Sequence, residues 1–258
     1  MDIENLAENI DRVVTIDVPS RGLILKLYDA ARRMQGKPLT LLAAERLKKN
    51  VHPGDAVLIT TGFIIPPWMV PETDGPPGTS VLARALDLAL EAKTVVATES
   101  KACSILTATA RAAGMITAEM GSLKSLRHAI HIRDFPVDDA KAKTEAETLI
   151  ENLKPSAVIA IEKTGKNEKG IYHNMRGLDV SRESAKVNHL FTQAKSRGIL
   201  TIGVGDGGNE VGMGKIVDAV KKNVRYGDKC QCPCGAGIAA ATEADVLVAA
   251  TVSNWGAY

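Results

Sequence analysis

The regular alternation of short apolar runs with longer amphipathic stretches constrains this chain more than any other feature. Apolar runs predict strands at 56–62, 94–98, 115–118, 156–162, 199–205 and 244–252. Apolar residues at helical spacing predict helices at 3–15, 23–35, 38–49, 79–92, 101–113, 138–154, 182–198 and 215–224. Strands that alternate with helices of this length form parallel βαβ units, with helices on both faces of the sheet. We therefore predict an α/β fold with a mostly parallel sheet, a Rossmann-like, doubly wound three-layer sandwich.

A chain of 258 residues is long enough for one large domain or two small ones. No internal repeat or linker divides it, although the segment 120–137 is irregular enough to be a joint. We predict a single α/β catalytic domain over 1–258, with an N-terminal helical segment over 1–50.

Charge and composition exclude several classes of function. Lys and Arg number 32 against 30 Asp and Glu, a net charge of +2, whereas a general nucleic-acid binder normally has a strongly basic face. The three Phe, two Trp and four Tyr are too few for a base-stacking platform. No apolar run approaches the roughly 18 residues of a membrane span. The acidic, polar N-terminus is unlike a secretory signal, so we expect a cytoplasmic protein with reduced thiols, no nucleic-acid partner and no membrane contact.

The cysteines are unevenly distributed. Cys103 lies alone in a helical stretch, whereas Cys230, Cys232 and Cys234 form a C-x-C-x-C run whose spacing would put all three on one face of a strand. A thiophilic metal site usually shows C-x-x-C pairs or an added His, and no His follows Cys234. Incidental thiols are therefore favoured over a metal site, which stays as the alternative.

Most of the unusual chemistry follows the predicted strands. In an open α/β sheet, ligands bind outside the carboxyl ends of the strands. The Gly clusters, the Pro pairs and most of the singled-out Asp, Glu, Asn, His and Arg residues fall in the segments 63–78, 162–179, 206–214 and 253–258, each directly after a predicted strand or at its end. This convergence predicts a site at that edge of the sheet.

The Gly-rich segment 203–214 does not fit a dinucleotide site. Gly203, Gly205 and Gly208 match G-x-G-x-x-G, but no helix opens at once and no acidic residue evidently ends a second strand, so no NAD is expected. Instead Asp206, Asn209 and Glu210 offer the oxygen ligands that Mg²⁺ or Mn²⁺ prefers. The glycines, Gly207 and Gly208 among them, would let the backbone approach a ligand closely. The alternative is a Gly-rich turn whose polar side chains bond only the local backbone.

Further carboxylates lie at two other strand ends. Glu72 and Asp74 are candidate cation ligands or a general acid/base pair, and the helix start near Gly75 and Gly78 could hold a carboxylate or phosphate on free N–H groups. The alternative there is a rigid Pro-Gly turn. Glu162 ends an apolar strand, so it either binds a cation or has a raised pKa suited to acid/base work. Its alternative is a salt bridge with Lys163.

Three more side chains complete the predicted site. Arg176 could clamp a substrate carboxylate or phosphate, and His173 could titrate near neutrality, although a lone His is more often structural. Asn254 could cap the pocket, with a plain terminal turn as the alternative.

At these residues the sequence resembles the D-glutamate cyclase-like family. The matching motifs are VPETDGPPG (70–78), IAIEKTGKNEKGIYHNMRGLDVS (159–181), TIGVGDGGNEVGMG (201–214) and VSNWGAY (252–258). The resemblance implies an α/β fold and cyclisation of D-glutamate to 5-oxo-D-proline with loss of water. Longer eukaryotic members carry a further domain before this one, and similar chains continue past N-W-G-A-Y. This chain is either a short member or incomplete after 258.

Two mechanisms fit the predicted residues. In a cyclase, a cation at Asp206, Glu210 and Glu162 would polarise the substrate carboxyl group, and Glu72 or Asp74 would protonate the leaving oxygen. Arg176 or Lys163 would hold the α-carboxylate. In a Mg/Mn-dependent phosphatase, the same cation would activate water against a small phosphate ester. A non-catalytic small-acid-binding domain is the third alternative. Dimerisation is common for such chains, although no residue pattern here indicates a homodimer.

Overall fold

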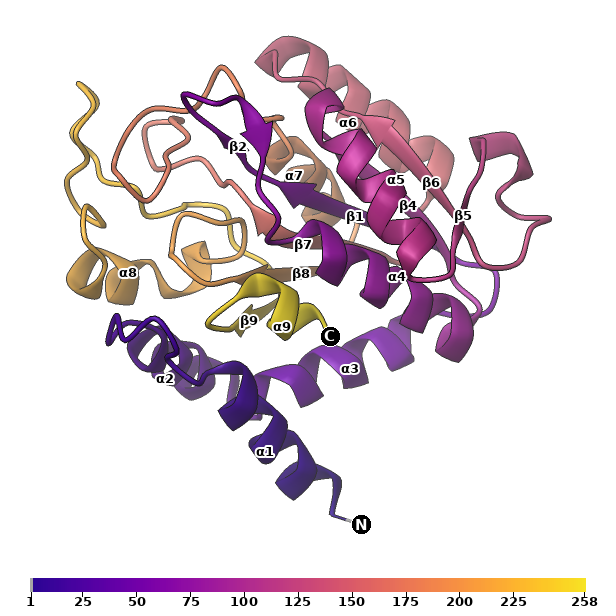
Figure 1. The fold of residues 1–258 in the computed structure, drawn as a ribbon, viewed down its shortest axis with the longest axis horizontal. Helices are drawn as coiled ribbons and strands as arrows, with labels where there is room; N and C mark the ends of the chain where they lie inside the picture. Colours follow the sequence, from indigo (N-terminus) through magenta and orange to yellow (C-terminus); the bar gives the residue numbers. More distant parts are fainter. Residues whose placement is uncertain (1) are drawn as a thin grey trace.

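The computed structural model describes residues 2–258 and contains one seven-stranded sheet (Figure 1). Every strand pair in this sheet is parallel, and the order is β5-β6-β4-β1-β7-β8-β9. The strands are β1 (Ala56–Gly62), β4 (Lys93–Thr98), β5 (Ile116–Thr117), β6 (Ala129–Asp134), β7 (Ala157–Lys163), β8 (Leu200–Gly205) and β9 (Val246–Ala249). A small antiparallel hairpin, β2 (Ile64–Ile65) and β3 (Val70–Pro71), follows β1.

Helices cover both faces of the sheet (Figure 1). Successive apolar side chains of a strand point to opposite faces, so each face needs a layer of helices to bury them. Val57 and Ile59 share a core with helices of one layer, whereas Leu58 packs with those of the other. The first layer contains α2 (Ile24–Gln35), α3 (Leu39–Asn50), α4 (Pro76–Leu90), α5 (Cys103–Ala112), α8 (Val217–Asn223) and α9 (Ser253–Ala257). The second contains α6 (Asp139–Leu153) and α7 (Asn188–Ser196). The predicted α/β three-layer, Rossmann-like architecture is confirmed.

The N-terminal helix α1 (Ile3–Val14) reaches away from the sheet and is tied to the body by a buried acid. The Asp11 carboxylate accepts hydrogen bonds from the backbone N–H groups of Leu39 (2.6 Å) and Thr40 (3.2 Å). These are free donors at the start of α3, so α1 supplies the cap that α3 lacks in its own sequence.

The structure corrects three expectations about local structure. The segment 120–137 is not simply irregular, because β6 lies in it and pairs with β4 and β5. Helix α7 begins at Asn188 rather than at 182, because the backbone N–H of Ala185 donates to the buried Glu99 carboxylate instead of to a helical carbonyl. The three clustered cysteines lie in an irregular segment between α8 and β9 rather than on a strand.

The order of the strands creates a crevice between β1 and β7. From β1 the chain adds β4 and β6 on one side and then returns to place β7 on the other. The loops after β1 and β7 lead to α4 and α7, which lie on opposite faces of the sheet. Side chains at the carboxyl ends of these two strands therefore meet at a topological switch point, where open α/β sheets bind ligands.

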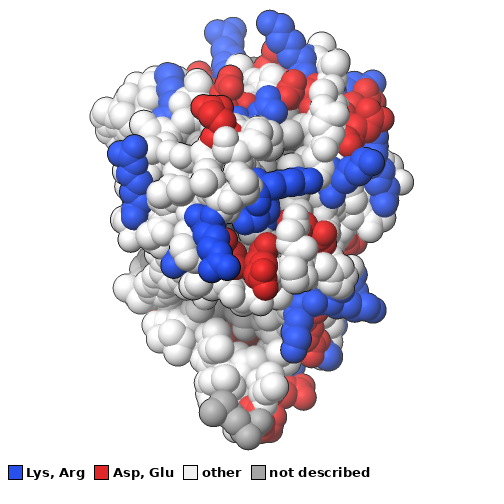
Figure 2. Space-filling view, turned by 90° about the vertical axis from the view of Figure 1, so that its right-hand side faces the viewer, with Lys and Arg blue, Asp and Glu red and all other residues white. Residues whose placement is uncertain are grey.

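Within residues 2–258, no helix combines the length and apolar character that crossing a membrane requires. Figure 2 shows one face of the molecule, on which Lys and Arg are interspersed with Asp and Glu rather than gathered into a patch of one sign.

Candidate functional site

Carboxylates from the end of β7 and from the loops after the β2–β3 hairpin and after β8 converge at the carboxyl edge of the sheet. Asp74, Glu162 and Asp206 each place an oxygen within 4.8 Å of the others. Glu210 completes the group, because its carboxyl group and that of Asp206 are hydrogen-bond partners. We call these four residues the carboxylate cluster. The predicted convergence of acids from different strand ends is thus present in the structure.

An irregularity in β7 positions Glu162. Thr61 pairs with Ile161, but the next residue of β1, Gly62, pairs with Lys163, so Glu162 is the extra residue of a bulge. Its φ of 45° is unusual for a residue with a side chain and turns the carboxylate out of the strand alternation. The Ser253 hydroxyl donates a 2.5 Å hydrogen bond to Glu162 Oε2. A strained backbone held at a convergence of acids is typical of a functional site.

The predicted anion site at the start of α4 is not formed. The backbone N–H groups of Gly75 and Gly78 donate to Asn254 Oδ1 at 2.9 and 2.7 Å, and Pro76 and Pro77 between them have no N–H group. The N–H of Thr79 donates to the carbonyl of Gly75. Asn254 therefore caps α4 through space and occupies the donors that a phosphate or carboxylate would need.

Backbone N–H groups of the same two segments orient Asp74. Its carboxylate accepts from the backbone N–H groups of Gly75 (2.9 Å), Asn254 (2.8 Å) and Ser253 (3.0 Å). Gly75 has φ 98°, and a side chain there would overlap Thr61 Oγ1 and come within 3.0 Å of Glu162 Cβ. Glycine at this position lets the loop after β1 pack directly on the end of β7.

Within the Gly-rich loop, the backbone binds a carboxylate of the chain itself. The N–H groups of Gly207 and Gly208 donate to Glu210 at 2.8 and 2.7 Å. A Cβ atom at Gly207 would lie 2.6 Å from Met175 Sδ, so this glycine accommodates protein atoms closely. The buried amide of Asn209 donates to the carbonyl of His173 at 2.8 Å, and Asn209 Oδ1 has no hydrogen-bond partner among the described residues.

Burial and mutual repulsion favour the protonated forms of the carboxylate cluster. The pKa of Glu162 is raised by burial and then by the charges of Asp206, Glu210 and Asp74. Burial also raises the pKa values of Asp206 and Asp74, the latter against three backbone hydrogen bonds that stabilise its charge. Either protons or a cation must therefore offset the negative charge that gathers here.

Glu72 lies beside the carboxylate cluster and is partly exposed. Burial raises its pKa, and the charges of Asp74 and Glu210 raise it further. Arg21, from the loop between α1 and α2, opposes this effect and also lowers the pKa of Asp206. Sequence analysis missed Arg21, because nothing in its local sequence relates it to the strand ends.

Lys163 follows Glu162 in sequence but points elsewhere. Its fully buried ammonium group donates to the Glu99 carboxylate and, at 2.9 Å, to the carbonyl of Gly62. The alternative of a Glu162–Lys163 salt bridge is therefore wrong, because Lys163 pairs with Glu99. Glu99 directly follows the strand predicted at 94–98, so the strand-end rule could have found it, as it could have found Ser253.

Two further predicted residues lie away from the carboxylate cluster. The imidazole Nε2 of His173 is 3.2 Å from the sulfur of Cys232 and 3.7 Å from that of Cys234. Arg176 is exposed and lines a surface cavity with Arg225, Tyr226 and Gln231. Neither side chain is therefore brought together with Asp74, Glu162 and Asp206.

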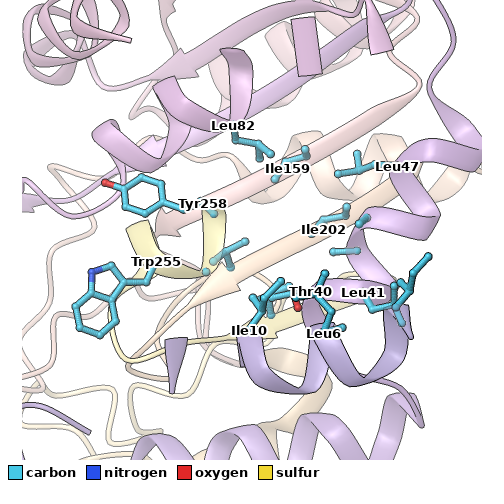
Figure 3. Close-up of a pocket in the computed structure, with 18 residues that line it drawn as sticks. Leu6, Ile10, Thr40, Leu41, Leu47, Leu82, Ile159, Ile202, Trp255 and Tyr258 are labelled. Carbon is cyan, nitrogen blue, oxygen red and sulfur yellow. The ribbon is translucent and has the colours of Figure 1, made fainter. Parts of the chain in front are cut away.

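A separate apolar groove of about 310 Å³ lies between α1, α3 and α9 (Figure 3). Leu6, Ile10 and Leu47 line it from the helical side, and Trp255 and Tyr258 stand at the α9 end. Apart from the Tyr258 hydroxyl, the described residues that line this groove have no titratable side chains, so the groove offers no acid/base groups.

The carboxylate cluster has the donors that a hard divalent cation prefers. Asp74, Glu162 and Asp206 supply carboxylate oxygens close enough together to share one ion. The positive charge of such an ion would offset the repulsion between the ionised carboxylates. The residues therefore fit Mg²⁺ or Mn²⁺. Asn209, which was predicted as a further ligand, donates its side-chain N–H to the carbonyl of His173.

Known proteins resemble this chain along most of its length. Residues 10–258 match the family model described as D-glutamate cyclase-like, C-terminal. The human protein named "D-glutamate cyclase, mitochondrial" is 36% identical over 214 residues, which cover 79% of this chain and 31% of the relative. The chain thus spans under a third of that relative's length. A short-chain type dehydrogenase/reductase from Mycobacterium ulcerans is 11% identical with a TM-score of 0.34, over 60% of this chain and 52% of that one.

Proposed function

The chain belongs to the D-glutamate cyclase-like family, and on that premise we propose that it is a lyase that closes D-glutamate into 5-oxo-D-proline with loss of water. The observation that carries the proposal is the convergence of Asp74, Glu162 and Asp206 at the β1/β7 crevice. These are groups that can move protons, and proton movement is what this reaction needs.

The reaction has a simple proton balance. The substrate amine attacks the carbon of the γ-carboxylate, a C–N bond forms and a C–O bond breaks. The substrate ammonium loses two protons, and the departing carboxylate oxygen gains two to leave as water. The site must therefore take protons from nitrogen and deliver them to an oxygen of the same molecule.

The carboxylate cluster can relay these protons. Burial raises the pKa of Glu162 and of Asp206, which favours the protonated form, so either can serve as the acid that donates to the departing oxygen. A neighbouring ionised carboxylate, such as Asp74 with its three backbone donors, then accepts a proton from the amine. Glu72, half-buried beside them, is the second candidate acid.

Substrate charge decides what else the site requires. Glutamate brings two carboxylates into a region that is already acidic, so the α-carboxylate needs a cationic partner. We propose Arg21 for this role, since its charge reaches Glu72 and Asp206, while Lys163 is occupied by Glu99. A Mg²⁺ or Mn²⁺ ion held by Asp74, Glu162 and Asp206 would, when bound, polarise the γ-carboxyl group as a Lewis acid. Those three carboxylates would then be ionised ligands, and the role of proton donor would pass to Glu72.

The other predicted activities gain no support. A phosphatase would use the start of α4 as its phosphate site, and Asn254 occupies those donors. A non-catalytic small-acid-binding domain stays an alternative, and the test below separates it from an enzyme. A cytoplasmic location and a homodimer stay predictions.

The test is a product assay on the full chain. D-glutamate is incubated with the protein after chelation and again after addition of Mg²⁺ or Mn²⁺, and 5-oxoproline is followed by proton NMR. We expect product from D-glutamate, and a rate about 10²–10⁴-fold lower in Glu162→Gln. Glu151→Gln, which removes an exposed carboxylate on α6, is the matched control and keeps the full rate.

Two outcomes would overturn the proposal. The first is that D-glutamate raises the thermal stability of the chain but gives no product under any of these conditions, which would indicate a binding domain. The second is equal turnover in Glu162→Gln and Glu151→Gln, which would place the chemistry outside the carboxylate cluster.

A further inference from the structure

Three thiols and an imidazole converge near the carboxylate cluster but form a separate group. The sulfur of Cys230 lies 3.5 Å from that of Cys232 and 3.3 Å from that of Cys234. His173 Nε2 lies 3.2 Å from Cys232 Sγ and 3.7 Å from Cys234 Sγ. The four donor atoms all fall within 4.8 Å of one another. We call these four residues the thiol cluster.

The spacing of the donor atoms suits a tetrahedral ion. In a tetrahedral zinc site the Zn–S distance is about 2.3 Å and the Zn–N distance about 2.0 Å, which puts neighbouring ligand atoms roughly 3.5–3.8 Å apart. The four distances between the donors of the thiol cluster, 3.2–3.7 Å, are close to this edge length. They are much longer than the S–S bond of about 2.05 Å in a disulfide.

Contacts within the protein hold the two contributing loops together. The N–H of Gln231 donates to the carbonyl of Gly177 at 2.9 Å, which joins the cysteine segment to the loop that carries His173. The Asn167 side chain donates to the carbonyl of Gly237 at 2.8 Å and approaches Cys234 Sγ at 3.5 Å. Gly237 has φ 73°, and a side chain there would overlap the carbonyl oxygen of Gly227. The donors are thus brought together by the fold of these loops.

We propose that the thiol cluster binds a single zinc ion through the sulfurs of Cys230, Cys232 and Cys234 and through His173 Nε2. Soft thiolates with one imidazole select zinc over the hard cations that suit carboxylates. Four protein ligands fill the tetrahedral shell, which is the arrangement of a structural site rather than a catalytic one. On binding, each thiol releases its proton to solvent, and the ion exchanges solvent ligands for the four protein donors.

A zinc ion here would brace the edge of the carboxylate cluster without taking part in its chemistry. His173 is buried, and its carbonyl accepts the hydrogen bond from the Asn209 side chain. Asn209 directly precedes Glu210, which bonds Asp206. Across the same loop, the N–H of Ala240 donates to the carbonyl of Gly208 at 3.0 Å. The ion would therefore fasten the cysteine segment and the His173 loop on either side of residues 206–210.

The test measures zinc in the full chain purified without a metal-affinity resin. Elemental analysis of wild type should give a single zinc ion per chain, and cobalt(II) substitution should give the intense visible d–d bands of a tetrahedral thiolate site. Cys232→Ser should bind zinc at least about tenfold more weakly. Cys103→Ser, on α5 and outside the thiol cluster, and Glu210→Gln, in the carboxylate cluster, are the controls that keep zinc.

A second measurement covers variants that fail to fold. Wild type stripped with a chelator under reducing conditions should regain its melting temperature on titration with zinc chloride, and magnesium chloride should not replace zinc. The proposal is overturned if freshly purified wild type holds no zinc and takes none up, if Cys232→Ser binds zinc as tightly as Cys103→Ser, or if two of the three cysteines are recovered as a disulfide. Because Glu210→Gln tests the carboxylate cluster separately, loss of turnover alone leaves the zinc result intact.

Discussion

The loop after β8 supplies Asp206 and Glu210 to the carboxylate cluster and contacts His173 of the thiol cluster through Asn209, yet the two clusters are assembled in different ways. The carboxylates come from the ends of three strands, and the parallel sheet itself brings them together. The thiols come from one irregular segment, and only a contact between two loops adds His173. Hard oxygen donors thus depend on the topology of the sheet, whereas soft donors depend on how its loops pack.

The largest effect should separate catalysis from zinc binding. Asp206→Asn removes a proton-carrying group, so turnover of D-glutamate should fall about 10²–10⁴-fold. Zinc content should stay at the wild-type level, because Asp206 is not a donor of the thiol cluster. Product NMR and elemental analysis on one preparation measure both quantities. Loss of zinc in Asp206→Asn would show that the two clusters are not independent.

The second prediction concerns the buried ammonium group of Lys163, which pairs with Glu99. Lys163→Met leaves the Glu99 charge buried without its partner, so the free energy of unfolding should fall by about 3–5 kcal/mol. Urea unfolding measures this, and the exposed Lys169→Met is the matched control. Adding Glu99→Gln to Lys163→Met should recover part of the loss. If Lys163→Met raised KM without lowering the free energy of unfolding, that result would instead support the substrate-binding role predicted for Lys163 from the sequence.

A smaller effect should appear in the pH dependence of stability. Because the pKa of Glu162 is raised in the folded chain, that chain keeps a proton that the unfolded chain has already released above its ordinary pKa near 4.5. The free energy of unfolding therefore falls as the pH rises from the pKa of Glu162 in the unfolded chain to its raised pKa in the folded chain. The fall is about 1.4 kcal/mol for each unit of difference between the two pKa values, and there is no further change above the folded pKa.

Glu162→Gln removes the loss of stability that ionisation of the buried Glu162 causes. In the presence of chelator the variant should be more stable than wild type at pH 8, and the difference should vanish near pH 4, where both states of wild type are protonated. Glu151→Gln should show no such trend. Denaturant midpoints at the two pH values measure the effect, and an equal difference at pH 4 and pH 8 would contradict it.

The smallest effect concerns the cap of α4. Asn254→Ala removes the acceptor for the N–H groups of Gly75 and Gly78, so the free energy of unfolding should fall by about 0.5–2 kcal/mol. The three backbone N–H groups that hold the Asp74 carboxylate remain in this variant, so turnover should stay near the wild-type level. Thermal unfolding checks the first effect, with Asn50→Ala at the end of α3 as the control. Unchanged stability would mean that water replaces Asn254 at these donors.

The fold was predictable because periodicity is a local property of the sequence. Strand β1 falls on the predicted 56–62, and β7 and β8 each begin one residue later than predicted. Strand β6 was missed because it has no continuous apolar run, although the alternation of His131 and Arg133 with its apolar residues is itself typical of a half-buried strand. Helix α7 begins late because a tertiary hydrogen bond to Glu99 replaces the expected first turn.

The candidate site was predictable only as far as strand ends define it. Asp74, Glu162 and Asp206 were found because each follows or ends an apolar run. Arg21 was not found, because its place beside Glu72 depends on residues far away in the chain. Glu99 follows a predicted strand, and only its pairing with Lys163 depends on tertiary structure. The C-x-C-x-C run was recognised, but its imidazole lies 57 residues before the first of the three cysteines, outside any spacing rule.

The sequence by itself determined the alternating elements, and with them the sheet edge at which the acids gather, because hydrophobic periodicity and parallel topology are properties of the chain. The tertiary structure alone decided how each side chain is used. It turned the buried Glu162 out of the strand alternation through a bulge and paired Lys163 with Glu99. It also capped the start of α4 with Asn254 and placed His173 among the thiols. These outcomes depend on which buried polar group finds a partner, and that is settled only when distant segments pack together.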